Sequence, residues 1–374
     1  RFVATVLDDS RLVRVQGPVP RARPDITRPR DPRALIGYTV CNADGDDGEA
    51  LSDYDIIGSE QRRSGLFALQ GAGHFSLLCI PPLERERDVG MSTLVVAARL
   101  CRQRHSLLVV DPPQDWTTPG KAIDAMRRWP FHTCDALMFY PRLLAQDRLR
   151  GRTEAFAACG AVAGQFARRD RLMPVWQEEE GDVVPLRPSL RPAVTLDDGE
   201  RYLLANYGVN TFGPARGAAH ECFTTRSLAA TVGAALEPRL LAGRRLALLV
   251  IASVERGTRW VLYGTADSIR RQRVTAQVLT LLEGLAAEGA FAPGLHSSFV
   301  ICDDRLNGPG VGRVGEFRLL FGYAPVRDGE FQAWLTTHRP GGSVTRTVSV
   351  NRMATFGERV EIEVQTSILR GLTL

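Results

Sequence analysis

Lysine is almost absent from this sequence, because Lys121 is the only lysine among 47 basic residues. This bias toward arginine is more typical of a coding preference than of a phosphate-binding surface. The formal net charge is +5, and residues 1–33, with eight arginines and four acidic residues, account for about +4 of it. The rest of the chain shows no stripe of basic and aromatic residues along a helix, which a nucleic-acid-binding surface usually has. Nucleic-acid binding is therefore the weakest function class.

Long apolar runs are also missing. The longest clean run, LALLVIASV at residues 246–254, is far shorter than the roughly 20 residues that a membrane helix needs. The sequence therefore predicts a soluble protein without direct membrane insertion.

The seven cysteines form no CxxC pair and are never closer than 22 residues apart. Their odd number and wide spacing argue against a zinc site and against a dense disulfide scaffold. Most of them lie in apolar segments, where cysteine behaves as a small buried hydrophobic residue. We expect reduced, structural thiols and no bound metal.

Sequence motifs for catalysis and cofactor binding are absent, incomplete or followed by the wrong structural element. No G-x-S-x-G elbow and no P-loop occur. The glycines at 310, 312 and 315 precede an expected strand, whereas a dinucleotide site needs a helix there. The carboxylate-rich segment 42–55 lacks the glycine and glutamate of a calcium loop, and HECFT at 220–224 lacks the second histidine of a zincin. We therefore expect no catalytic residue, no cofactor and no metal ligand.

One stretch, GAFAPGLHSSFVICDD at 289–304, gathers residue types that hydrolases use. His296 and Ser297 are adjacent at the start of an expected strand, so their side chains point to opposite faces. A strand with polar ends, including Ser298, explains the stretch better than a catalytic group. A subtilisin-like hydrolase remains the alternative function.

The order of apolar segments from Ala34 onward predicts an α/β domain. Short continuous apolar strands alternate with helices, which is typical of a parallel sheet covered on both faces. The expected strands are FSLLCIPP, SLLVVDPP and CDALMFYP. Each strand is followed by an expected helix, which is MSTLVVAARLCRQ, TPGKAIDAMRRW and EAFAACGAVAGQFARR in turn.

A second unit begins near Glu221, and helical periodicity with glycine after the last turn predicts two helices in it. These are SLAATVGAALEPRLLAG and ADSIRRQRVTAQVLTLLEGLAAEG. Four strands accompany them: LALLVIAS, SSFVICD, GEFRLLFGYAP and EFQAWLTTH.

Both ends of the chain read as strands outside these units. The first, RLVRVQG, precedes an extended Pro/Arg-rich linker at 18–33, and the last, RVEIEVQTSI, alternates cleanly. A strand on a linker pairs either within its own chain or with a sheet edge of a neighbour. Opposite charges on the two strands would help to select the partner. The candidate residues for strand exchange between subunits are Arg11, Val13, Arg14, Val15, Val360, Glu361, Ile362, Glu363 and Val364.

An ordered set of motifs from about Gly45 to about Val350 resembles the contractile tail sheath proteins of phages and phage-like injection systems. The motifs are GDDGEALSDYDIIG, SGLFAL, FSLLCIPP, AARLCRQRHSLLVVDPP, DALMFYPRL, CGAVAGQFARRD, LLANYGVNTF, LEGLAAEGAF with SSFVICDD, and GYAPVRDGEFQAWLTTH. One departure follows ARRD, where Trp176 is kept but the family's Lys-Ala-Pro is replaced.

The resemblance implies a subtilisin-like parallel-sheet α/β domain without a catalytic triad, followed by a smaller α+β C-terminal domain, with extended strand arms at both ends. The implied limits are 1–33 for the N-terminal arm and linker, 34–220 and 221–352 for the two domains, and 353–374 for the C-terminal arm.

The resemblance also implies a structural, non-enzymatic role. Sheath subunits stack as hexameric rings around an inner tube, and their arms exchange strands while the rigid bodies repack on contraction. The implied partners are further copies of this chain, the inner tube protein, and the baseplate and tail-terminator or cap proteins. The implied location is a virion tail or an injection-system particle assembled in the bacterial cytoplasm.

Overall fold

The computed structural model describes residues 50–84, 87–177, 185–214, 220–223, 226–229, 240–263, 268–291, 298–308, 315–325, 331–348, 351–356 and 359–363. Every element discussed below belongs to one structural unit, Leu51–Leu374. The N-terminal strand predicted at residues 11–17 lies outside the described residues.

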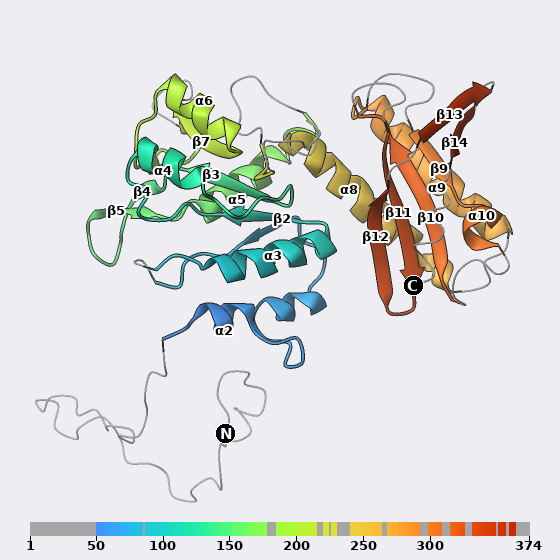
Figure 1. Ribbon diagram of the computed structural model, residues 1–374, viewed down its shortest axis with the longest axis horizontal. Coiled ribbons are helices and arrows are strands. Elements are labelled where there is room, and N and C mark those ends of the chain that lie inside the picture. The colour runs from blue at the N-terminus through green and yellow to red at the C-terminus, as the bar shows by residue number, and fades with distance from the viewer. Residues whose placement is uncertain are drawn as a thin grey trace, which may run out of the picture. The chain divides into compact units, whose positions relative to one another are not determined.

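A five-stranded sheet is the centre of the first half of this unit (Figure 1). Its strands follow the order β1-β2-β3-β7-β8, and all neighbours are parallel except β7 and β8. The strands are β1 (Leu77–Cys79), β2 (Leu107–Val110), β3 (Ala136–Tyr140), β7 (Val209–Pro214) and β8 (His220–Phe223). The parallel sheet expected from the apolar segments is therefore confirmed.

Helices cover both faces of this sheet, as β2 shows. Leu108 and Val110 belong to a core shared with helices α3, α4 and α6, whereas Leu107 and Val109 belong to a core shared with α5. Successive strand residues point to opposite faces, so a continuous apolar run fills both cores. The helices are α3 (Met91–Arg104), α4 (Pro119–Met126), α5 (Cys159–Arg169) and α6 (Asp198–Asn206). A short helix α2 (Asp53–Ile57) and a 3₁₀ helix η1 (Gly65–Gly71) precede them.

Local sequence signals set several helix ends. Thr118 caps α4, and Pro119 fills its first position, where no backbone donor is needed. Asp197 and Glu200 form a reciprocal capping box at the start of α6. Helix α3 ends at His105, which adopts a left-handed conformation with φ 52°.

The segment 154–169, predicted as one helix, contains a strand and a helix. Residues Thr153–Phe156 form β5, which pairs with β4 (Leu143–Gln146), and β4 also pairs with β6 (Arg191–Pro192). Helix α5 begins only at Cys159 because the carboxylate of Asp111 accepts hydrogen bonds from the amides of Ala158 and Cys159. That cap comes from a distant part of the chain, so the local pattern could not reveal it.

The prediction of a strand at LALLVIAS is wrong, because this segment lies inside helix α8 (Leu241–Thr258). This helix is buried on two sides. Leu248 packs in the core with β2, β3 and α5, whereas Val250 and Ile251 pack in the core with helix α9. A helix between two cores has no broad polar face, so its periodicity is hidden, and a short apolar run does not distinguish it from a strand.

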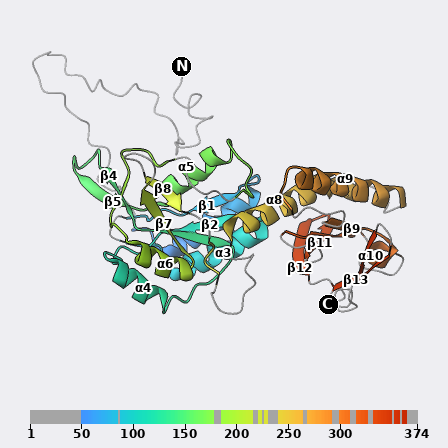
Figure 2. The ribbon, with the colours of Figure 1, turned by 90° about the horizontal axis from the view of Figure 1, so that it is seen from above.

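The second half contains an antiparallel four-stranded sheet in the order β12-β11-β10-β9. Its strands are β9 (Ser298–Ile301), β10 (Phe317–Tyr323), β11 (Gln332–Arg339) and β12 (Gly342–Val348). Helix α9 (Ser268–Ala287) covers one face through Val274, Val278 and Leu282 (Figure 2). The short helices η2 (Arg259–Leu262) and α10 (Asp304–Asn307) complete this part.

A two-stranded sheet of β13 (Asn351–Phe356) and β14 (Arg359–Glu363) follows. The domain limits 34–220, 221–352 and 353–374 stay predictions, as does the subtilisin-like character of the first domain. Within the part of the chain that the structure describes, no helix combines the length and the apolar character required to cross a membrane.

Candidate functional site

The predicted strand-exchange residues fall into two groups. Arg11, Val13, Arg14, Val15 and Val364 lie outside the described residues. The others, Val360, Glu361, Ile362 and Glu363, lie in β14. In the structure, β14 pairs antiparallel with β13 of its own chain, with Val360 opposite Thr355 and Ile362 opposite Arg352. The strand character expected for this segment is confirmed, and its exchange between subunits stays a prediction.

An open sheet edge lies close by in the sequence. Among the described residues, β12 pairs only with β11, so one side of β12 carries unpaired backbone groups. Half-buried and exposed residues mix along Gly342–Val348. A strand of seven residues with one side unpaired within the described part of the chain is a template on which another strand can add.

The carboxyl ends of the parallel strands are where α/β enzymes usually place their chemistry. Here Asp111, which follows β2, uses its Oδ1 atom to hold the amides of Ala158 and Cys159, at 2.7 and 2.8 Å. Burial raises the pKa of Asp111, although these hydrogen bonds oppose the shift. The carboxylate acts as a helix cap, which is a structural role.

The nearby arginine is occupied in a similar way. Buried Arg142 donates to the carbonyl of Pro112 at 3.1 Å and pairs with Asp88. Arg142 therefore fixes the loop after β2 against the segment before α3. Among the described residues, no three histidine, cysteine or acidic side chains converge as a metal site.

The hydrolase alternative gains no geometric support from the described residues. His296 and Ser297 lie outside them, and Ser298 is the first residue of β9, opposite Tyr323 of β10. Ser298 is therefore part of a sheet ladder, as the reading of a strand with polar ends expected.

Polar contacts gather instead along α8. Glu255 Oε1 lies 3.2 Å from His105 Nε2 and accepts a hydrogen bond of 2.6 Å from the Thr345 hydroxyl. The glutamate thus binds both the end of α3 and strand β12. Near the other end of the helix, Arg245 pairs with Asp170, which follows α5, and its guanidinium lies over the Phe166 ring.

The surroundings shift two of these ionisable groups. Burial acts to raise the pKa of Glu255, but His105 and the Thr345 hydroxyl together hold it below its usual value. Burial lowers the pKa of His74, and the charges of Arg256, Arg104 and His105 lower it further. His74 therefore lies in a locally positive potential.

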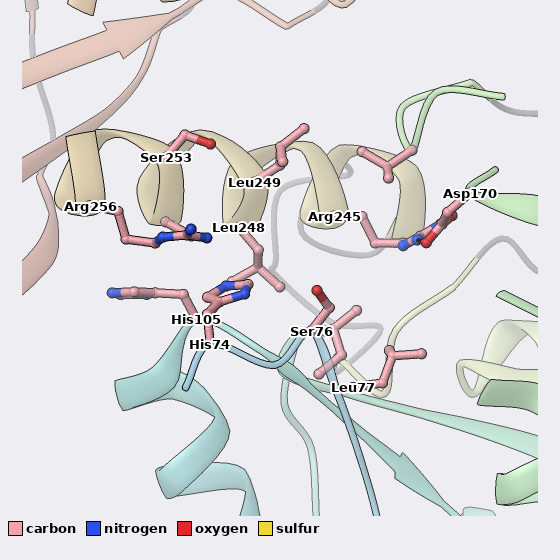
Figure 3. A pocket seen from close by; sticks show the side chains of 13 residues that line it. His74, Ser76, Leu77, His105, Asp170, Arg245, Leu248, Leu249, Ser253 and Arg256 are labelled. Carbon is pink, nitrogen blue, oxygen red and sulfur yellow. Dashed lines mark hydrogen bonds and ion pairs between the residues drawn. The ribbon is translucent and has the colours of Figure 1, made fainter. Parts of the chain in front are cut away.

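A cavity of about 110 Å³ lies between α8 and the start of β1 (Figure 3). His74, Ser76 and His105 approach it from one side, while Arg245, Ser253 and Arg256 line it from α8. Sequence reasoning missed this site because its residues come from four distant segments. The backbone of His105 at the end of α3 is left-handed, but no sequence motif predicts this conformation.

No family model and no curated protein matches this chain. Solved structures do match. A chain of the PVC sheath complex, an extracellular contractile injection system in the contracted state, aligns with a TM-score of 0.56 at 20% identity, covering 72% of this chain and 73% of that one.

Two chains from the anti-feeding prophage (AFP) are also similar. A chain of the contracted helical sheath has a TM-score of 0.51 at 15% identity, with 72% of this chain and 73% of that one covered. A chain of the sixfold-symmetrised baseplate has the same TM-score and identity, with 69% and 67% covered. This chain therefore has a sheath-like fold, and these structural neighbours are structural proteins rather than enzymes.

Proposed function

We propose that this chain is a structural subunit of a contractile tail sheath, assembling as stacked hexameric rings around an inner tube. The observation that carries the proposal is the match to the contracted PVC sheath, which extends over 72% of this chain and 73% of that one. The match therefore covers nearly three quarters of each chain. The ordered sequence motifs from Gly45 to Val350 support the same role independently of the fold.

The role is mechanical and needs no catalytic group. Contraction would repack rigid subunits into tighter contacts and drive the tube through a target envelope, with small interface gains summed over many copies. The polar side chains that an enzyme would use, such as Asp111 and Arg142, are engaged in capping and pairing. The partners would be further copies of this chain, the tube, the baseplate, and a terminator or cap, in a phage tail or injection-system particle assembled in the bacterial cytoplasm.

Strand exchange through both ends would connect the subunits. The N-terminal segment with Val13 and Val15 and the C-terminal segment with Val360 and Ile362 would add to sheets of neighbouring copies. The edge of β12 supports this idea, because none of the described strands pairs with that side of it. In this view the β13–β14 pairing is the arrangement of the single chain, and assembly would replace it.

Negative-stain electron microscopy of the concentrated protein, alone and with its cognate tube protein, tests the main proposal. Hollow tubes of uniform width are expected, at the latest after the tube protein is added. A chain that stays monomeric in both samples would contradict a sheath role.

Deletion variants test the strand exchange. Removing residues 1–17 or 358–374 should abolish tube formation while circular dichroism and gel filtration still show a folded monomer. The matched control removes only residues 369–374, which leaves the alternating segment 359–368 intact. Normal tubes from both long deletions would refute the exchange without refuting the sheath role.

A further inference from the structure

The cavity beside α8 carries more positive than negative charge. Arg245 and Arg256 contribute from the helix, and Arg104 and His105 contribute from the end of α3. His74 approaches from the segment before β1. The acidic groups that face this region are Asp170, paired with Arg245, and Glu255, paired with His105. Three arginines against two carboxylates leave an excess of one positive charge.

Arg245 supplies a second, independent observation. Its side chain is only 8% exposed, yet Nη1 has no hydrogen-bond partner among the described residues. Its other terminal nitrogen, Nη2, holds Asp170. A buried guanidinium N–H without a partner is costly, and this arginine lines the cavity (Figure 3). The missing partner of Nη1 would be an acceptor atom of a ligand.

We propose that this cavity binds a small tetrahedral oxyanion of the phosphate class. Donors come from opposite walls, with His74 and Ser76 on one side and Arg256 on α8. An anion with oxygens in four directions can accept from both walls, which a planar carboxylate cannot do as well. The volume of about 110 Å³ is large enough to hold such an ion.

The bound oxyanion would join segments that are far apart in the sequence. It would link α8 to the start of β1 and to the end of α3, next to the His105–Glu255 contact. Binding would also favour the protonated form of His74, whose pKa is lowered by burial and by the neighbouring positive charges.

Thermal unfolding of the whole chain tests the proposal. Sodium phosphate is titrated against sodium chloride and against sodium acetate at constant ionic strength and constant pH. We expect a saturable rise in Tm with phosphate only. An equal response to acetate, or none beyond that of chloride, would overturn the assignment.

Two variants locate the site. Arg256→Gln removes an exposed arginine, so it should fold normally, and it should weaken phosphate binding about tenfold, as expected for the loss of one charge-assisted contact. The control Arg128→Gln removes the same charge from an exposed position outside the cavity, and should change the apparent Kd less than about twofold. Equal weakening in both variants would show that only net charge matters and would refute a built site.

Discussion

The side-chain amide of Asn210 is bound at both of its ends to the main chain of Arg226. Its Nδ2 donates to the Arg226 carbonyl at 2.8 Å, and its Oδ1 accepts from the Arg226 amide at 3.0 Å. Nδ2 also donates to the carbonyl of Met138 at 3.2 Å. One buried side chain in β7 thus holds the segment around Arg226 against the sheet.

Replacing Asn210 with alanine should therefore be costly. Asn210→Ala leaves the partly buried backbone groups of Arg226 without these partners, and we expect a loss of about 3 kcal/mol in the free energy of unfolding. Urea denaturation measures this loss. The control is Asn206→Ala, in the same sequence motif at the end of α6, which should cost less than about 1 kcal/mol. Equal losses in both variants would show that the three hydrogen bonds of Asn210 do not contribute to the free energy of unfolding.

Gly208, in the turn before β7, should not tolerate a side chain. It has φ +79°, and a Cβ atom placed on it would lie 2.5 Å from the Ser227 carbonyl oxygen. Gly208→Ala combines backbone strain with a clash against main chain, so we expect a loss of at least about 2 kcal/mol in the free energy of unfolding.

The matched control for that substitution is Gly164→Ala. Gly164 lies inside α5, where an added Cβ would meet nothing within 4 Å. Alanine favours helix over glycine by up to about 1 kcal/mol, so this variant should be neutral or stabilised. Destabilisation of both variants to the same extent would contradict the steric argument.

His338 is fully buried in β11 and should make stability depend on pH. The Thr258 hydroxyl donates to the Val254 carbonyl, so it accepts from His338 Nε2 at 2.7 Å. The neutral ring then accepts at Nδ1 from the Ser343 hydroxyl, also at 2.7 Å. Burial lowers the pKa of His338, and the charge of Glu255 opposes this only in part.

A histidine whose pKa is lowered in the folded state stabilises the protein fully above its unfolded pKa, near 6.5. That contribution is lost as the pH falls from about 6.5 toward the lower folded value. His338→Gln should flatten the decline of unfolding free energy between pH 7 and pH 5. The exposed His132 gives the control His132→Gln, which should keep the wild-type slope, and an unchanged slope in His338→Gln would disprove the assignment.

Glu255 should cause a further loss of stability at lower pH. Its lowered pKa means that the carboxylate stabilises the fold above its unfolded pKa, near 4.3, and that this contribution disappears as the pH falls through the folded value. Glu255→Gln should cost about 1–3 kcal/mol at pH 7, because the contacts to His105 and Thr345 weaken.

The same variant should lose less stability than the wild type between pH 5 and pH 3. Chemical denaturation at a series of pH values measures the difference in unfolding free energy between the two proteins. The contributions of the other carboxylates cancel in this difference. Parallel curves over the whole range would show that Glu255 does not titrate with folding.

Much of the parallel sheet was predictable, because its strands are short apolar runs that end at proline, and its helices carry clear ends such as Thr118-Pro119. Helix α8 was not, since two cores conceal its periodicity. The start of α5 was also missed, because its cap is the distant Asp111. The cavity beside α8 could not be predicted either, as sequence spacing says nothing about His74 meeting Arg256 across the fold.

Helix α8 also has a mechanical consequence. Its 18 residues span about 27 Å. Arg244 near its start is bound to buried Asp135, and Thr258 at its end is bound to His338 of β11. A helix fixed near both ends acts as a stiff strut, so a load on β11 would be carried along its axis to the parallel sheet. A displacement of one half of the chain would then move the other half with it.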